Sequence, residues 1–296
     1  MYDIKAYWEA NSAEEAVRLL LDHPEARVFA GGSDLLVQLR DGKLTDAELV
    51  SIHGIDSLRG VSLDPDGTVR IGALTSFSRL HTDPVILECI PPLAEAAGEV
   101  GGPQIRNIGT IGGNICNASP TADTPPTLLA WDAELELLGP CGTRRLPMRD
   151  FYTGAKKVDR KPGELLAAVL IPRKALQDYT GKMFKYAVRE ALDTSIVNCS
   201  VSVRLSHDGE SIDRIRAAFG GAVGPIPLRA SSAEAAVTGQ ALTGQTVNMF
   251  AEAVLRDIHP RDGWRASKAL REQIAGELAK RALMESVRLA GGVIHE

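Results

Sequence analysis

Two short segments of the chain combine paired glycines with hydroxyl and amide side chains. The first is Ala30-Gly31-Gly32-Ser33-Asp34, and the second is Thr110-Ile111-Gly112-Gly113-Asn114. Glycines let backbone N–H groups approach a ligand closely, and a helix that starts after them favours a bound phosphate. Either segment alone is equally typical of a tight turn. Together they suit an elongated ligand with a pyrophosphate in its middle, held by two separate strand-loop units.

The remaining residue types do not indicate another kind of chemical site. Neither glycine segment has the G-x-G-x-x-G spacing of a Rossmann turn or the terminal Gly-Lys-Ser/Thr of a P-loop. The histidines are not grouped at ligand spacing, and no nucleophile or acid-base pair stands out. The sequence therefore predicts no metal site and no catalytic residue on this chain. The four cysteines are scattered without a C-x-x-C pair and are expected to be free thiols: Cys89, Cys116, Cys141 and Cys199.

The charge and hydropathy patterns exclude two classes of partner. The formal net charge is -5 and the lysines and arginines are dispersed, so nucleic acid is not an expected partner. No stretch approaches the roughly 20 apolar residues of a membrane span, and the N-terminus has neither a basic start nor an apolar run. We therefore expect a cytoplasmic protein without a membrane partner.

Regular elements are predicted on both sides of the first glycine segment. Ser12 and Glu15 form a capping box, which predicts a helix running to about His23. A strand at 27–30 leads into the glycines, and a helix begins at Leu35. Further elements are expected as strands at 49–52, 69–71, 133–137 and 165–171, and as helices at 74–81 and from 91 onward.

The second glycine segment is predicted to be irregular, and the pattern changes after residue 174. The stretch 101–114 is too rich in glycine for a regular helix or strand and is expected to be a shaped loop. Long alternating strands follow at 195–205 and 212–219, and a last amphipathic helix carries apolar residues from Leu270 to Val287. This change predicts a domain boundary near residue 175.

Four stretches resemble a known family over nearly the whole chain. AGGSDLLVQLR at 30–40 and QIRNIGTIGGNICNASPTAD at 104–123 resemble the two FAD-binding signatures of the molybdenum hydroxylase flavoproteins. FKYAVRE at 184–190 and WRASKALR at 264–271 continue the resemblance. The chain is most similar to bacterial FAD-binding (medium) subunits of the xanthine dehydrogenase type.

The resemblance implies an α+β fold in two domains. Residues 1–175 would form a two-lobed FAD-binding domain of the vanillyl-alcohol-oxidase/PCMH type, with lobes at about 1–55 and 56–175. Residues 176–296 would form a smaller α/β C-terminal domain like that of the carbon monoxide dehydrogenase flavoprotein, with an antiparallel sheet and helices.

The resemblance also places FAD on particular residues. Asp123 would hold a ribose hydroxyl, Leu166 would pack on the cofactor, and Lys185 would lie near the flavin end. A capping carboxylate, a core leucine and a solvated lysine are the alternative readings of these three residues. Val100 stands where animal members have an adenine-stacking aromatic, which implies aliphatic packing here. The two loops at the cofactor would be Val28, Phe29, Ala30, Gly31, Gly32, Ser33, Asp34 and Leu35, and Ile108, Gly109, Thr110, Ile111, Gly112, Gly113 and Asn114.

The implied function is that of an FAD-dependent oxidoreductase subunit in purine metabolism. It would take electrons from the [2Fe-2S] clusters of a small partner subunit, in a complex with a molybdopterin-binding large subunit, and pass them to NAD or another acceptor. Related flavoproteins serve carbon monoxide, nicotinate and aldehyde dehydrogenases, so these substrates stay open. A flavin-free scaffold and a free-standing flavin oxidase are further alternatives; the oxidase would need its own acid-base groups.

Overall fold

The N-terminal lobe is a small parallel sheet of three strands. One helix precedes the second strand in the sequence, and another follows it. The computed structural model describes residues 2–296, and its first sheet has the strand order β1-β3-β2. Apolar residues of the first helix, including Val17 and Leu20, pack in one core cluster with Val50 of the third strand and Ile52 just after it. The elements are β1 Ile4–Glu9, α1 Ala13–Asp22, β2 Arg27–Phe29, α2 Leu35–Arg40 and β3 Ala47–Ser51.

The predicted helix after Ser12 is confirmed, with one difference at its start. Ser12 Oγ accepts a hydrogen bond from the Glu15 N–H at 3.1 Å, as an N-cap residue should. The Glu15 carboxylate accepts from the N–H of Asn11 at 2.8 Å, one residue before the position that a capping box uses. The Glu15 N–H, one of the donors that a helix start leaves unpaired, is thereby satisfied.

The middle lobe is an antiparallel sheet with helices packed against it. Its strand order is β4-β5-β10-β6-β7, and the central strand β10 is buried almost throughout. The strands are β4 Val61–Leu63, β5 Val69–Gly72, β6 Glu134–Gly139, β7 Gly142–Pro147 and β10 Leu165–Ile171, with the small hairpin β8 Tyr152–Gly154 and β9 Lys157–Val158. The helices are α3 Phe77–Thr82, α4 Pro84–Cys89, α5 Pro91–Gly98, α6 Pro103–Ile108, α7 Ile111–Asn117, α8 Pro125–Ala130 and α9 Arg173–Leu176, with single 3-10 turns at Asp56–Leu58 and Met148–Asp150.

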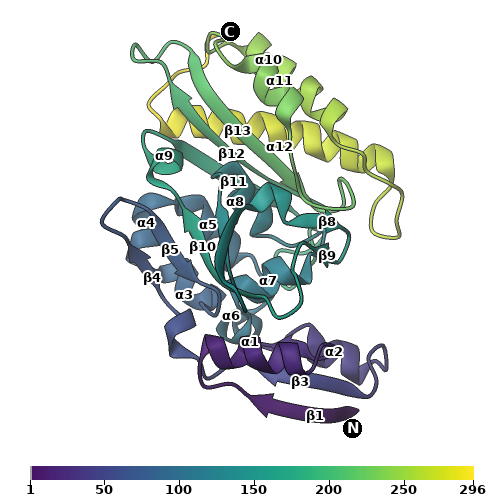
Figure 1. The fold of residues 1–296 in the computed structure, drawn as a ribbon. Coiled ribbons are helices and arrows are strands. Elements are labelled where there is room, and N and C mark those ends of the chain that lie inside the picture. Colours follow the sequence, from purple (N-terminus) through teal and green to yellow (C-terminus); the bar gives the residue numbers. More distant parts are fainter. Residues whose placement is uncertain (1) are drawn as a thin grey trace.

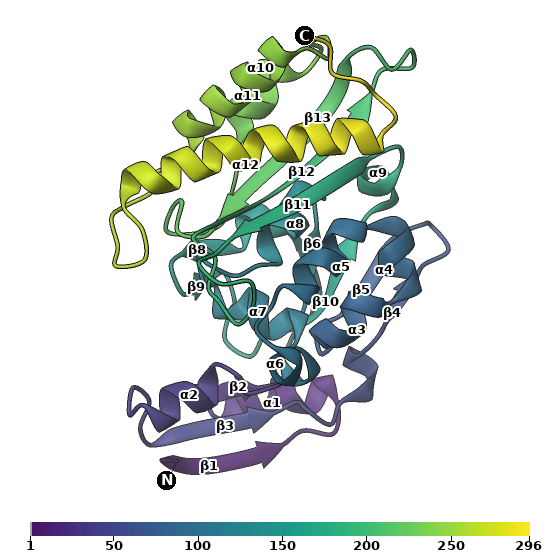
Figure 2. The ribbon, with the colours of Figure 1, turned by 180° about the vertical axis from the view of Figure 1, so that it is seen from behind.

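The C-terminal part is a second antiparallel sheet with three helices on one face. The strand order is β11-β12-β13-β14, and the long helix α12 crosses β11 and β12 (Figures 1 and 2). The other face meets the middle lobe through α5 and α8. The elements are β11 Thr180–Tyr186, β12 Val197–Leu205, β13 Ile212–Gly220, β14 Leu228–Arg229, α10 Ser231–Val237, α11 Gly244–Asp257 and α12 Lys268–Leu289.

The prediction of an irregular loop at 101–114 is wrong, because the stretch contains two short helices. Pro103 starts α6, where its fixed φ suits a first helical position. Thr110 caps α7 by accepting a hydrogen bond from the Gly113 N–H at 3.2 Å. Ile111 and Ile115, four residues apart, are both fully buried in the main core. Capping and burial at helical spacing therefore outweigh the low helix propensity of the glycines.

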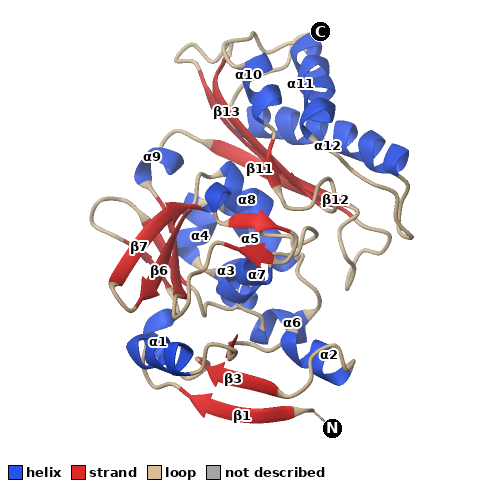
Figure 3. Cartoon of the chain, turned by 45° about the vertical axis from the view of Figure 1, so that its right-hand side comes forward, coloured by secondary structure: helices blue, strands red, loops and turns tan. Residues whose placement is uncertain are grey.

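Residues 2–296 form three packing units in sequence order, with the N-terminal lobe at one end and the C-terminal sheet at the other (Figure 3). This α+β arrangement, with antiparallel sheets and covering helices, agrees with the predicted fold class. Within residues 2–296, no helix has the length and apolar character needed to cross a membrane. The division at residue 175 stays a prediction.

Candidate cofactor site

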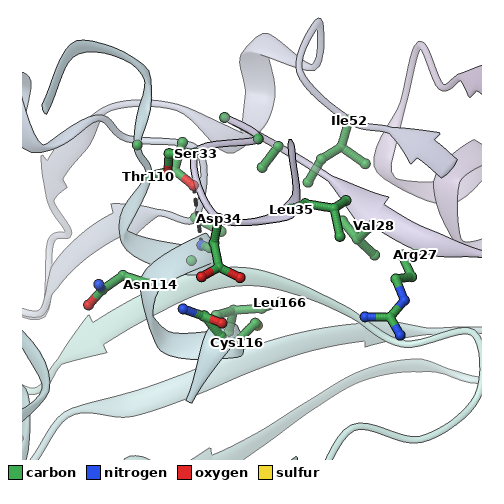
Figure 4. Close-up of a pocket in the computed structure, with 18 of the residues that line it drawn as sticks. Arg27, Val28, Ser33, Asp34, Leu35, Ile52, Thr110, Asn114, Cys116 and Leu166 are labelled. Carbon is green, nitrogen blue, oxygen red and sulfur yellow. Dashed lines mark hydrogen bonds between the residues drawn. The ribbon is translucent and has the colours of Figure 1, made fainter. Parts of the chain in front are cut away.

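A large cavity lies between the N-terminal lobe and the middle lobe. Its volume is about 880 Å³, within the size range of small-molecule and cofactor sites. The cavity is lined by the first glycine segment, by the turn and helix around Thr110, and by Leu166 of β10. In Figure 4 the first segment lies above, and Asn114, Cys116 and Leu166 lie below it. The fold thus brings together the two segments that residue types alone singled out.

Gly31 is required by the contact between the two segments. A Cβ atom at this position would overlap the carbonyl oxygen of Ile108, at the end of α6. Gly32 adopts a φ of +70°, a left-handed conformation that residues with side chains rarely take. The glycine pair therefore lets the strand β2 turn sharply while its loop touches the opposite lobe.

The first segment presents free backbone donors to the cavity. The N–H groups of residues 31 to 34 donate to no acceptor within residues 2–296. These residues all line the cavity. A run of unpaired backbone donors at a cavity wall fits an anionic group such as a pyrophosphate, because unsatisfied N–H groups need an acceptor. This feature is the part of the site that fits FAD most directly.

The second segment contributes shape and side chains, since the N–H groups of residues 111 to 114 are already bonded. Ile111 N–H donates to the Thr75 carbonyl and Gly112 N–H donates to the Ala73 carbonyl. A Cβ on Gly112 would lie 2.7 Å from the Ala73 Cβ, so this glycine serves packing within the lobe. Asn114 Oδ1 accepts from Thr124 Oγ1 at 2.8 Å, and its amide nitrogen remains as a donor toward the cavity.

Most of the predicted site residues line the cavity, and five do not. Phe29 supports Gly32, Ile111 is in the core, and Ile108 meets the first loop through its carbonyl oxygen. Asp123 and Lys185 lie outside the lining altogether. The predicted residues that line the cavity are Val28, Ala30, Gly31, Gly32, Ser33, Asp34, Leu35, Gly109, Thr110, Gly112, Gly113, Asn114 and Leu166, and Val100 joins them.

Asp123 and Lys185 bond to each other. Lys185 Nζ donates to Asp123 Oδ2 at 3.0 Å, and both side chains are buried. The carboxylate also accepts from Ser195 Oγ and from Asn198 Nδ2, while Lys185 donates to the Glu99 carbonyl at 2.9 Å. Burial raises the pKa of Asp123, and the nearby Lys185 charge opposes this rise. The pair joins β11 and β12 to the middle lobe, and its predicted contact with the cofactor stays a prediction.

Several lining residues were not predicted from the sequence. Cys116 and Asn117 lie just after the second segment, at the end of α7. Lys156 lies in the turn of the β8–β9 hairpin, and Arg160 lies just after that hairpin. Burial raises the pKa of the Cys116 thiol to about 11, so at neutral pH it stays protonated and lines the wall as a small apolar group. Cys116 lies within the FAD signature at 104–123, so the sequence motif could have indicated it. Lys156 and Arg160 lie in no motif that would have indicated them. Among the described residues, no group of three His, Cys, Asp or Glu side chains is placed to hold a metal.

Comparison with known proteins gives the family. The family described as the FAD binding domain in molybdopterin dehydrogenase matches residues 2–174, more than half of the chain. The chain belongs to this family. A second family, the CO dehydrogenase flavoprotein C-terminal domain, matches residues 182–286 of the flavoprotein. The chain is therefore an FAD-binding subunit of the molybdenum hydroxylase type, as the sequence signatures indicated.

Individual relatives cover the flavoprotein from end to end. A putative xanthine dehydrogenase FAD-binding subunit of Escherichia coli (strain K12) is 39% identical over 292 residues, 99% of each chain. The carbon monoxide dehydrogenase medium chain of Hydrogenophaga pseudoflava is 32% identical over 278 residues, 94% of this chain and 95% of that one. A solved structure of carbon monoxide dehydrogenase from the same organism is 32% identical with a TM-score of 0.91, and the match covers 98% of this chain and 99% of that one.

Proposed function

We propose that the flavoprotein is the FAD-binding electron-transfer subunit of a xanthine or purine dehydrogenase in the cytoplasm. The observation that supports the cofactor role is the run of unpaired N–H groups at residues 31 to 34, all of which line a cavity of about 880 Å³. The purine substrate rests on similarity, since the xanthine dehydrogenase subunit of E. coli is 39% identical over 99% of both chains.

The residues would hold FAD along the length of the cavity. The N–H groups of residues 31 to 34 would bind the pyrophosphate, and Thr110 and Asn114 would close the opposite side with a hydroxyl and an amide. Leu166 and Val100 supply apolar walls for the ring systems. By the family resemblance, Asp123 would hold a ribose hydroxyl and Lys185 would stand near the flavin end, although both lie outside the lining of the cavity.

Bound FAD supplies the redox chemistry, accepting electrons singly and releasing them as a pair. The electrons come from the [2Fe-2S] clusters of a small subunit, after a molybdopterin-binding large subunit has hydroxylated the purine. NAD, or another acceptor, takes them from this subunit. The chain itself positions the cofactor and shields it from water, and it needs no catalytic acid or base.

A second candidate keeps the subunit role and changes the substrate of the complex. The carbon monoxide dehydrogenase medium chain of H. pseudoflava is 32% identical over nearly the full length. The substrate binds a different subunit, so the residues of this chain do not contact it. Carbon monoxide, nicotinate and aldehydes are therefore the substrates to compare with xanthine.

The test is anaerobic reduction of the assembled complex. The chain is co-expressed with its molybdopterin and iron-sulfur partners, and flavin absorption is followed after addition of xanthine, nicotinate, carbon monoxide or glyceraldehyde. The proposal predicts rapid bleaching by xanthine only, and recolouring when NAD is added. Rapid bleaching by another of these substrates, with no response to xanthine, would overturn the purine assignment. The isolated chain with xanthine is the control and should stay oxidised.

A further inference from the structure

Lys156 connects the two glycine segments across the mouth of the cavity. It lies in the turn between β8 and β9 and belongs to the cavity lining. Its Nζ donates to Asn117 Oδ1 at 2.7 Å, at the end of α7. The same atom lies 3.9 Å from Asp34 Oδ1, in the first glycine segment. Among the described residues, no other cation pairs with side chains of both segments.

The backbone fixes the position of this side chain. Lys156 has a φ of +60°, in the left-handed region, and its N–H donates to the Ala118 carbonyl at 3.1 Å. Ala118 is itself left-handed at the end of α7. A left-handed turn bonded to the helix end places the lysine over the cavity, although the side chain is about half exposed. The fold therefore fixes where this side chain leaves the backbone.

The charges at this mouth suit an anion that enters between the segments. The first segment offers neutral N–H donors and one carboxylate, Asp34, which alone would repel a pyrophosphate. Lys156 stands beside that carboxylate and offsets its charge. Each pyrophosphate bound at the N–H groups of residues 31 to 34 would bring two negative charges within reach of a lysine on a flexible stem.

We propose that Lys156 is a latch that retains the dinucleotide by holding its pyrophosphate from the solvent side. The lysine keeps its bond to Asn117 and exchanges the longer contact with Asp34 for a phosphate oxygen. This inference rests on the proposed FAD site, and it adds to that site a residue from the turn of the β8–β9 hairpin. Its effect falls on cofactor release, because the contact forms after the dinucleotide has entered.

The experiment measures the rate of FAD release from the full chain. Lys156→Asn removes the charge while keeping a residue that tolerates positive φ, and Lys156→Arg keeps the charge. Lys157→Asn is the matched control, because Lys157 is the exposed neighbour outside the cavity lining. Release is followed by the rise in flavin fluorescence, and the affinity by titration of the apo chain with FAD.

The latch predicts that Lys156→Asn speeds release by about 10-fold, the size of one charge-assisted hydrogen bond. The difference should shrink at high salt, since the contact is half exposed. The rate of FAD release from Lys156→Arg should stay within about 3-fold of the wild-type rate. Lys157→Asn should release FAD at the wild-type rate. Equal release from Lys156→Asn and wild type would overturn the latch and leave the FAD site standing. A folded wild-type chain that binds no FAD would overturn the site itself, and the latch with it.

Discussion

At Gly31 a missing side chain is what lets the two halves of the pocket meet. The space for its Cβ is taken by the carbonyl oxygen of Ile108, a backbone atom that no rotamer change can move. The neighbouring Gly32 is required for a different reason, because its φ in the turn is +70°. The sequence showed that glycines stand here, but the reason for Gly31 lies in a contact between residues far apart in the chain.

Gly31→Ala should therefore damage both the fold and the site. Forcing a methyl group against backbone atoms costs about 1–3 kcal/mol or more, and the displaced loop no longer aims its N–H groups together. We expect a lower melting temperature and FAD binding weakened by at least about 10-fold. Gly54→Ala is the control, because no atom lies within 4 Å of its added Cβ. Two variants with equal FAD affinity would contradict the role given to Gly31.

At the scale of elements, the sequence predicted central strands well and edge strands poorly. Strands β5, β6, β10, β12 and β13 have continuous or alternating apolar residues because they are buried on one or both faces. Seven strands were not predicted, and each lies at the edge of its sheet: β1, β4, β7, β8, β9, β11 and β14. Edge strands carry more polar residues, so their pattern resembles that of loops.

The β11 strand is tied to the middle lobe by the buried Asp123–Lys185 pair. Lys185→Met leaves the Asp123 carboxylate buried without its counter-charge, which costs about 3 kcal/mol. Lys182→Met, on the same strand, removes a more exposed pair with Glu95 and should cost at most about 1 kcal/mol. Urea denaturation measures both free energies of unfolding. Similar losses of unfolding free energy in the two variants would show that the buried pair stabilises the fold no more than the exposed one.

The strand β7 is held by an ion pair that makes stability depend on pH. Arg144 donates two hydrogen bonds to Glu164, at 2.6 and 2.8 Å, and the Lys161 N–H donates another. Chiefly through the Arg144 bonds, the pKa of Glu164 falls below its usual 4.5 in the folded chain. The unfolded chain then binds the proton first, so this stability is present above pH 4.5 and is lost as pH falls through the folded-state pKa.

Glu164→Gln should flatten the acid side of the stability curve. We expect it to lower the free energy of unfolding by about 2 kcal/mol at neutral pH and to weaken the rise of that free energy with pH in the range below 4.5. Denaturant melts at a series of pH values give both quantities. Glu285→Gln, in the more exposed pair with Arg288, should change both quantities much less. An unchanged slope in Glu164→Gln would contradict the assignment.

At the scale of the whole molecule, the site depends on the arrangement of lobes. Residues 31 to 34 come from one lobe and Thr110, Asn114 and Leu166 from another, and the cavity exists only because the lobes meet. The sequence predicted both glycine segments and a ligand held between them. Lys156 and Arg160 escaped prediction, because their place at the cavity follows from long-range packing and not from local spacing.

The central claim is that this chain binds FAD in the cavity between its two N-terminal lobes. The most direct measurement is the visible absorption spectrum of the purified chain, with the released cofactor identified by mass after denaturation. We predict close to one FAD per chain, lost in Gly31→Ala and kept in Gly54→Ala. A chain shown to be folded by circular dichroism that carries no FAD and takes up none when it is added would contradict the claim.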